Sequence, residues 1–81
     1  MTQAEVLQRL QVLFDGIFLQ PVTVTPELSA KDVAEWDSLM QIQVVVAVEQ
    51  EFKVRFRVGE VEATRNVGEF ADLILKRSAE A

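Results

Sequence analysis

The stretch of sequence that decides the fold is residues 35–40, Glu35-Trp36-Asp37-Ser38-Leu39-Met40. It follows a segment with two prolines and precedes an apolar run at residues 42–48. This order places Ser38 at the predicted start of a helix. A hydroxyl there lies among backbone N–H groups that lack helical partners, and these groups and the helix dipole favour an attached phosphate.

Length and charge limit the classes of protein that fit. The 81 residues suffice for one small domain, and a hydrophobic content of 49% suffices for one core. The net charge is −5, from 13 acidic and 8 basic residues. Because the basic residues form no stripe beyond Lys53, Arg55 and Arg57, we expect no nucleic-acid partner. An acidic domain instead favours basic partner surfaces, through contacts that weaken as salt rises.

The chain contains neither cysteine nor histidine. It therefore has no disulfide framework, and it lacks both the usual general base near neutral pH and the commonest metal ligand. No signal peptide opens the sequence, and no apolar run approaches the ~20 residues that span a bilayer. These features predict a cytoplasmic, soluble protein with no membrane partner. Any thiol on the purified protein must belong to an attached group.

The first helix is predicted at about residues 3–18. Thr2 and Glu5 have the spacing of a capping box. The apolar residues that follow recur at helical intervals: Val6, Leu7, Leu10, Leu13, Phe14, Ile17 and Phe18. Residues 20–36 read as a long connection, in which Ser29 and Asp32 can cap one helical turn at residues 30–34.

A second helix is predicted at about residues 38–52. The β-branched residues of the run 42–48 fit a buried strand nearly as well on pattern alone. Three features favour the helix. The segment is long, Asp37 or Ser38 can cap it with Gln41 in position for a capping box, and it ends in the acidic sequence at residues 49–51. Beyond it, apolar and basic residues alternate over 52–58, which predicts an extended linker with its apolar side on the core.

A short helix at 59–64 and a final helix at 67–77 complete the predicted fold. Asn66 caps the final helix, Glu69 closes a capping box, and residues 76–81 form a frayed end. The fold class is therefore all-α, a small bundle of three long helices and one short helix with a long first loop. We treat residues 1–81 as a single domain.

Among the three serines, Ser38 alone combines a preceding acid, a following leucine and a helix start. A plain position in the first turn of a helix also explains it. However, the string Asp37-Ser38-Leu39 resembles the attachment motif of the acyl carrier protein family. Residues 49–52 (Glu-Gln-Glu-Phe) resemble the close of that family's second helix, and residues 66–70 (Asn-Val-Gly-Glu-Phe) the opening of its last helix. The resemblance extends over nearly the whole chain.

This resemblance implies that Ser38 carries 4′-phosphopantetheine, with Asp37 and Leu39 at the cofactor site. A phosphopantetheinyl transferase would attach the group from coenzyme A with the aid of magnesium. The terminal thiol would then hold acyl intermediates as thioesters, in fatty-acid or polyketide synthesis or a related pathway. The protein is then no enzyme and has no catalytic residue of its own. Its partners are the transferase and acyl-loading and acyl-processing enzymes, and we expect a monomer.

Several residues near Ser38 have more than one interpretation. Asp37 caps the helix, contacts the transferase or does both, and Trp36 is most simply an aromatic anchor. The residues predicted to contact partners are Met40, Glu35, Gln41 and Glu60. Val45, Val46 and Phe52 could line a groove for an acyl chain, although core packing explains them. The acidic residues before Ser38 are weak candidates for acid–base chemistry or a metal, and we predict no metal site.

The chain also departs from the family it resembles. Typical carriers of fatty-acid synthesis place acids early in the second helix, where this chain has the uncharged Met40, Gln41 and Gln43. Acidity is displaced to the residues on either side: Asp32, Glu35, Asp37, Glu49, Glu51, Glu60 and Glu62. The tryptophan before the motif favours a discrete carrier of a specialised pathway. A peptidyl or aminoacyl carrier and an unmodified helical interaction adaptor remain as alternatives.

Overall fold

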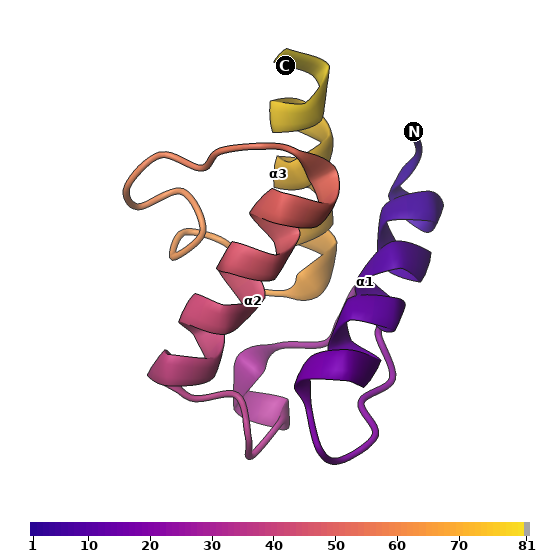
Figure 1. The fold of residues 1–81 in the computed structure, drawn as a ribbon, viewed down its shortest axis with the longest axis vertical. Helices are drawn as coiled ribbons and strands as arrows, with labels where there is room; N and C mark the ends of the chain where they lie inside the picture. Colours follow the sequence, from indigo (N-terminus) through magenta and orange to yellow (C-terminus); the bar gives the residue numbers. More distant parts are fainter. Residues whose placement is uncertain (81) are drawn as a thin grey trace.

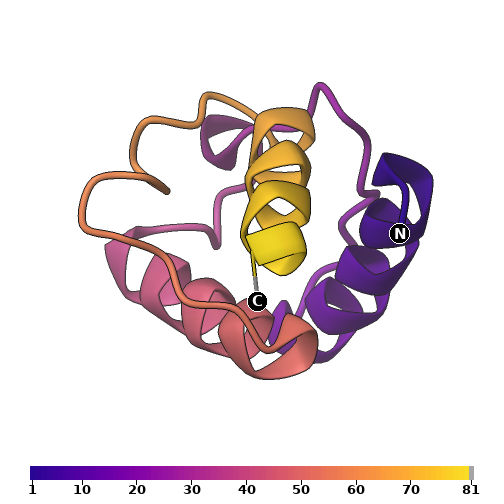
Figure 2. The same cartoon turned by 90° about the horizontal axis from the view of Figure 1, so that it is seen from above.

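The computed structural model describes residues 1–80 and is all-helical over that range. Its helices are α1 (Gln3–Ile17), α2 (Ser38–Phe52) and α3 (Val67–Glu80), with a short 3₁₀ turn, η1 (Ala30–Asp32), in the long first connection. Figure 1 shows α3 between α1 and α2, and Figure 2 shows the same arrangement from above. The predicted all-α fold class is confirmed, and the β-branched run at 42–48 is helical.

The core lies where α1 packs against α2 and α3. It has the helical periodicity predicted for the first helix, because Val6, Leu10, Phe14 and Phe18 are all buried. The remaining core residues come mainly from α2, the following linker and α3: Val44, Val48, Phe52, Val54, Val61, Val67, Phe70, Ala71 and Ile74. Thr2 caps α1 with the expected capping box, since its hydroxyl accepts from the Glu5 N–H and Glu5 accepts from the Thr2 N–H.

The short helix predicted at residues 59–64 is absent, and a series of turns takes its place. Gly59 has a φ of +86°, outside the right-handed helical region, so it cannot start a helix there. The backbone hydrogen bonds here do not keep one helical spacing. Ala63 N–H donates to the Gly59 carbonyl, four residues back, whereas Thr64 N–H donates to the Val61 carbonyl, three residues back. The Thr64 hydroxyl also donates to the Val61 carbonyl and holds the turn.

The final helix is longer than predicted, because it continues to Glu80 where a frayed end was expected from residue 76. Arg77 explains the difference: it is nearly buried, and its guanidinium pairs with the Glu60 carboxylate. Ala81 lies outside the described residues. The linker prediction holds for Val54, which is buried, but not for Val58, which is fully exposed.

The long loop before α2 is fixed to the helices at several points. The Gln11 side chain donates to the Val22 carbonyl at 2.7 Å and accepts from the Val24 N–H at 2.8 Å. The first N–H groups of α3 continue this attachment, since Gly68 N–H donates to the Pro26 carbonyl at 2.9 Å and Val67 N–H to the Leu28 carbonyl at 2.7 Å. The loop is therefore a fixed support for the start of α2.

Candidate functional site

The start of α2 is defined by Asp37. Its backbone is extended, and its carboxylate accepts from the Met40 N–H at 2.9 Å, so Asp37 is the N-cap. Ser38 is therefore the first helical residue, and its side chain is exposed. Within residues 1–80 the N–H groups of Ser38 and Leu39 have no hydrogen-bond acceptor. The exposed hydroxyl thus lies beside two free backbone donors at the positive end of a helix.

The residues around Ser38 are held by Trp36. Its ring packs edge-on against Phe14, with centroids 5.2 Å apart, and tilted against Phe18 at 5.7 Å. Its indole N–H donates to the Gln41 side-chain oxygen at 2.6 Å. The interpretation of Trp36 as an aromatic anchor is confirmed. The capping box predicted for Gln41 does not form, because its side chain bonds Trp36 instead.

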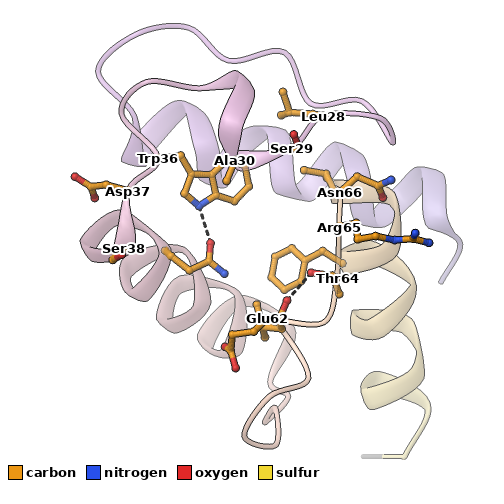
Figure 3. Close-up of a pocket in the computed structure, with 14 residues that line it drawn as sticks. Leu28, Ser29, Ala30, Trp36, Asp37, Ser38, Glu62, Thr64, Arg65 and Asn66 are labelled. Carbon is orange, nitrogen blue, oxygen red and sulfur yellow. Dashed lines mark hydrogen bonds between the residues drawn. The ribbon is translucent and has the colours of Figure 1, made fainter.

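A cavity of about 500 Å³ opens beside Ser38. It lies between η1, the start of α2, the turns at 61–66 and the start of α3, as Figure 3 shows. Its apolar lining comes from Leu28, Ala30, Trp36, Val61, Val67 and Phe70. In Figure 3, Trp36 points inward toward Gln41, whereas Arg65 points outward. A group attached at Ser38 thus has a partly apolar space beside its point of attachment.

The structure uses most of the predicted partner-contact residues internally. Glu35 accepts from the Leu19 and Gln20 N–H groups at 3.1 and 2.7 Å, which closes the start of the long loop. Met40 is half-buried against the core, and Gln41 bonds Trp36. Glu60 pairs with Arg77. Leu39, predicted for the cofactor site, is 64% exposed next to Ser38.

Sequence reasoning missed the exposure of two residues further along α2. Ile42 is 60% exposed and Val46 is 47% exposed, although both were assigned to an apolar run inside the helix or to a groove. One signal was available. Residues 38–48 contain no charge, and a surface helix must still turn one side to water. Apolar residues therefore had to be exposed on that side.

Two glutamates, Glu60 and Glu69, have a pKa below the ordinary value, and both lie away from Ser38 in sequence. The side-chain hydrogen bond from Arg77, followed by the Arg57 backbone N–H, lowers the pKa of Glu60. The Arg65 backbone N–H and side chain lower the pKa of Glu69. Only half of the capping box predicted at Asn66 and Glu69 forms. The Asn66 side chain accepts from the Glu69 N–H, but the Glu69 carboxylate accepts from the Arg65 N–H and not from the Asn66 N–H. The cap at Asn66 is confirmed.

No group of three or more potential metal-ligating side chains gathers within residues 1–80. Over the same residues, no helix is both long enough and apolar enough to cross a membrane. The features near Ser38 are an exposed hydroxyl, free helix N–H groups and a cavity. These suit a phosphodiester-linked group: the N–H groups can bind its phosphate, and the cavity can shelter what it carries.

Comparisons with known proteins point the same way. The family model described as the phosphopantetheine attachment site matches residues 23–74. The chain is 30% identical over 80 residues to an acyl carrier protein of Thermosynechococcus vestitus, covering 98% of this chain and 99% of that protein. It is 33% identical over 82 residues to one from Acidothermus cellulolyticus, covering 100% and 98%. The solution NMR structure of holo acyl carrier protein from Geobacter metallireducens superposes with a TM-score of 0.77 at 33% identity, covering 98% of this chain and 87% of that one.

Proposed function

The chain belongs to the acyl carrier protein family, whose domain bears a phosphopantetheine attachment site, and we propose that Ser38 is the residue to which the group is attached. The protein is a carrier with covalently bound 4′-phosphopantetheine, and such carriers are generally not catalytic. They interact with a phosphopantetheinyl transferase and with acyl-processing enzymes. The group supplies a terminal thiol, which this chain lacks because it has no cysteine.

The position of Ser38 is the observation that carries the proposal. Its side chain is exposed at the first residue of α2, beside the free N–H groups of Ser38 and Leu39. The other two serines lack this setting. The Ser29 hydroxyl donates to the Asp32 carboxylate in the cap of η1, and Ser78 lies near the end of α3. Ser38 alone offers a hydroxyl to an enzyme at the positive end of a long helix.

The chain's own residues favour binding of the phosphate over catalysis of its transfer. In the transfer, the Ser38 oxygen forms a bond to the phosphorus of coenzyme A that carries the pantetheine arm. The bond between that phosphorus and the oxygen that bridges the two phosphates breaks, and the oxygen leaves with its electron pair on the adenosine-bearing nucleotide. This chain contains no histidine to accept the serine proton, so we assign the role of base to the transferase. Asp37 binds the Met40 N–H and so caps the helix, and its contact with the transferase stays a prediction.

The experiment is intact-mass analysis after incubation with coenzyme A, magnesium and a broad-specificity phosphopantetheinyl transferase. We expect wild type to gain one phosphopantetheine and one titratable thiol, and Ser38→Ala to gain neither. Ser29→Ala and Ser78→Ala are matched controls that should gain the group as wild type does. Modification of Ser38→Ala would contradict the proposed site. A folded wild-type protein that stays unmodified would instead favour the helical interaction adaptor.

The finer features of the carrier remain proposals from the sequence. We propose a monomer that acts in the cytoplasm and serves a specialised pathway. The uncharged start of α2 supports the last point, because it departs from the acidic helix typical of fatty-acid carriers. Analysis of the thioesters bound to protein purified from its natural source would distinguish acyl cargo from aminoacyl cargo.

A further inference from the structure

The partly apolar cavity beside Ser38 contains a hydrogen-bond donor that the fold leaves open. The Trp36 indole N–H donates to the Gln41 side-chain oxygen at 2.6 Å. Because an indole N–H can only donate, this bond fixes which end of the Gln41 amide is the oxygen. The other end is the NH2 group, which has no acceptor within residues 1–80. No buried side-chain nitrogen or oxygen in that range lacks a partner, so this NH2 group is accessible to water and to a ligand.

The Gln41 donor is held in place before anything binds it. Its amide is bonded to Trp36, and Trp36 in turn packs against the buried rings of Phe14 and Phe18. Both Trp36 and Gln41 line the cavity, and Gln41 lies only three residues beyond Ser38 in the first turn of α2. A side chain that is already fixed loses little conformational freedom when a ligand binds it. The donor is therefore prepared for a group attached at Ser38.

The polar side chains of the turns at 61–66 do not offer a comparable donor to the cavity. Glu62 and Arg65 are exposed, and Figure 3 shows both turned away from the cavity, as is the end of the Asn66 side chain. The Thr64 hydroxyl already donates to the Val61 carbonyl at 2.6 Å. The rest of this wall is apolar. The Gln41 NH2 group thus faces a space in which few other groups compete for an acceptor.

A hydrocarbon chain and an oxygen-bearing chain would affect this donor differently. A hydrocarbon chain that enters the cavity displaces water from the Gln41 NH2 group and supplies no acceptor, which is unfavourable. A chain with a carbonyl or hydroxyl oxygen replaces the water with a hydrogen bond, in surroundings sheltered from solvent. The pantetheine arm carries a hydroxyl and two amides, more polar groups than this wall can bond. The arm therefore suits the water at the mouth of the cavity better than its interior.

We propose that Gln41 determines which chains the cavity accepts. Its NH2 group donates to a carbonyl or hydroxyl oxygen of the carried chain, so the protein favours an oxygen-bearing acyl group over a saturated hydrocarbon one. This inference rests on the proposed function and names the class of cargo. It gives Gln41 a role in binding the attached chain, in addition to its bond with Trp36.

The test compares two chains on Ser38, octanoyl and 3-oxooctanoyl. Each is loaded from its coenzyme A thioester by a broad-specificity phosphopantetheinyl transferase and verified by intact mass. We expect the 3-oxooctanoyl form to have a Tm about 4 °C or more above that of the octanoyl form. In ¹H–¹⁵N NMR spectra, the side-chain NH2 signals of Gln41 are identified by their absence in Gln41→Glu. They should shift in the 3-oxooctanoyl form relative to the form with the bare arm.

Two variants separate the donor from the fold. Gln41→Glu keeps an oxygen to accept the Trp36 N–H but removes the NH2 group, so the Tm difference between the two chains should fall below about 1 °C. Gln43→Glu is the matched control, because Gln43 is exposed on α2 and does not line the cavity. It should keep the wild-type difference. Comparison of two chains on one variant cancels any change in the stability of the variant itself.

Three results would each overturn the proposal. They are an equal Tm for both chains in wild type, an effect of Gln41→Glu no larger than that of Gln43→Glu, and the same Gln41 signals in the bare-arm and 3-oxooctanoyl forms. In all of them the chain is already attached at Ser38. They are therefore distinct from failure of the proposed function, which would appear earlier as a protein that cannot be loaded.

Discussion

At the scale of the single residue, Gly68 shows how closely the long loop lies against α3. A Cβ at this position would lie 2.9 Å from the Pro26 carbonyl oxygen, which also accepts the Gly68 N–H. We expect Gly68→Ala to destabilise the protein by about 1–3 kcal/mol, because the loop backbone must shift. Urea unfolding measures this change.

Gly16 provides the matched control for that substitution. It also lies in a helix, but a Cβ there would meet nothing within 4 Å. We expect Gly16→Ala to raise stability by about 0.5–1 kcal/mol through its higher helical propensity. Equal effects at the two glycines would show that the contact with Pro26 is unimportant.

Asp37 is a second residue whose role can be measured. Its carboxylate accepts the Met40 N–H, so Asp37→Ala should lower stability by about 1 kcal/mol. Asp37→Asn keeps an oxygen in place to accept this bond and should retain most of the stability. Thermal unfolding of the three proteins tests the cap. A slower modification of Ser38 in the stable Asp37→Asn variant would show that the transferase also recognises the negative charge of Asp37.

At the scale of the element, the ion pair between Glu60 and Arg77 joins the turns at 57–64 to α3. Hydrogen bonds from Arg77 and from the Arg57 N–H hold the pKa of Glu60 below its ordinary value of 4.5. The ionised form therefore stabilises the fold above about pH 4.5, and this contribution is lost as the pH falls through the lower pKa of the folded state.

The expected result is a difference in Tm between wild type and Glu60→Gln that is constant near neutral pH and narrows below about pH 4.5. Thermal unfolding between about pH 3 and 7 measures it. Glu62→Gln is the control, because Glu62 is exposed on the same turns, and it should follow the wild-type curve. A difference that persists unchanged at pH 3 would mean that the pair does not stabilise these turns through its charge.

Comparison of the elements shows why the helices could be predicted and the turns could not. Caps and periodicity are local, so Thr2 and Asn66 correctly mark two helix starts. The run at 42–48 was ambiguous from its residue types alone. In the structure Val44 and Val48 are buried and Val46 is exposed, which is the four-residue spacing of a helix. At 59–64 the backbone conformation of Gly59 overrides the apparent helical pattern.

The site residues divide in the same way. Ser38 could be selected because its neighbours in sequence define its setting. Glu35, Gln41 and Glu60 could not be assigned, because their partners are the backbone of residues 19 and 20, the Trp36 indole, and Arg77. A polar residue in a loop looks the same in sequence whether it faces a partner protein or satisfies a distant donor. Only the packing of the chain decides between them.

At the scale of the whole molecule, the exposed apolar surface is too narrow for a stable dimer. Exposed apolar side chains lie on one face of α2, at Leu39, Ile42 and Val46, and elsewhere at Val12, Leu19 and Val58. A stable interface usually buries about 1,200–2,000 Å² in total, more than one face of a four-turn helix supplies. We therefore expect a 9.1 kDa monomer in sedimentation equilibrium. A dimer that Val46→Glu dissociates would show instead that two copies meet at the exposed face of α2.

The placement of Trp36 has a consequence for how this protein can be observed. It is the only tryptophan in the chain, it lies two positions before Ser38, and its ring lines the cavity. Indole fluorescence changes with the polarity around the ring. A cargo that enters the cavity displaces water from the ring and shifts its emission. The single indole would then report the arrival and departure of such a cargo in real time, without a dye.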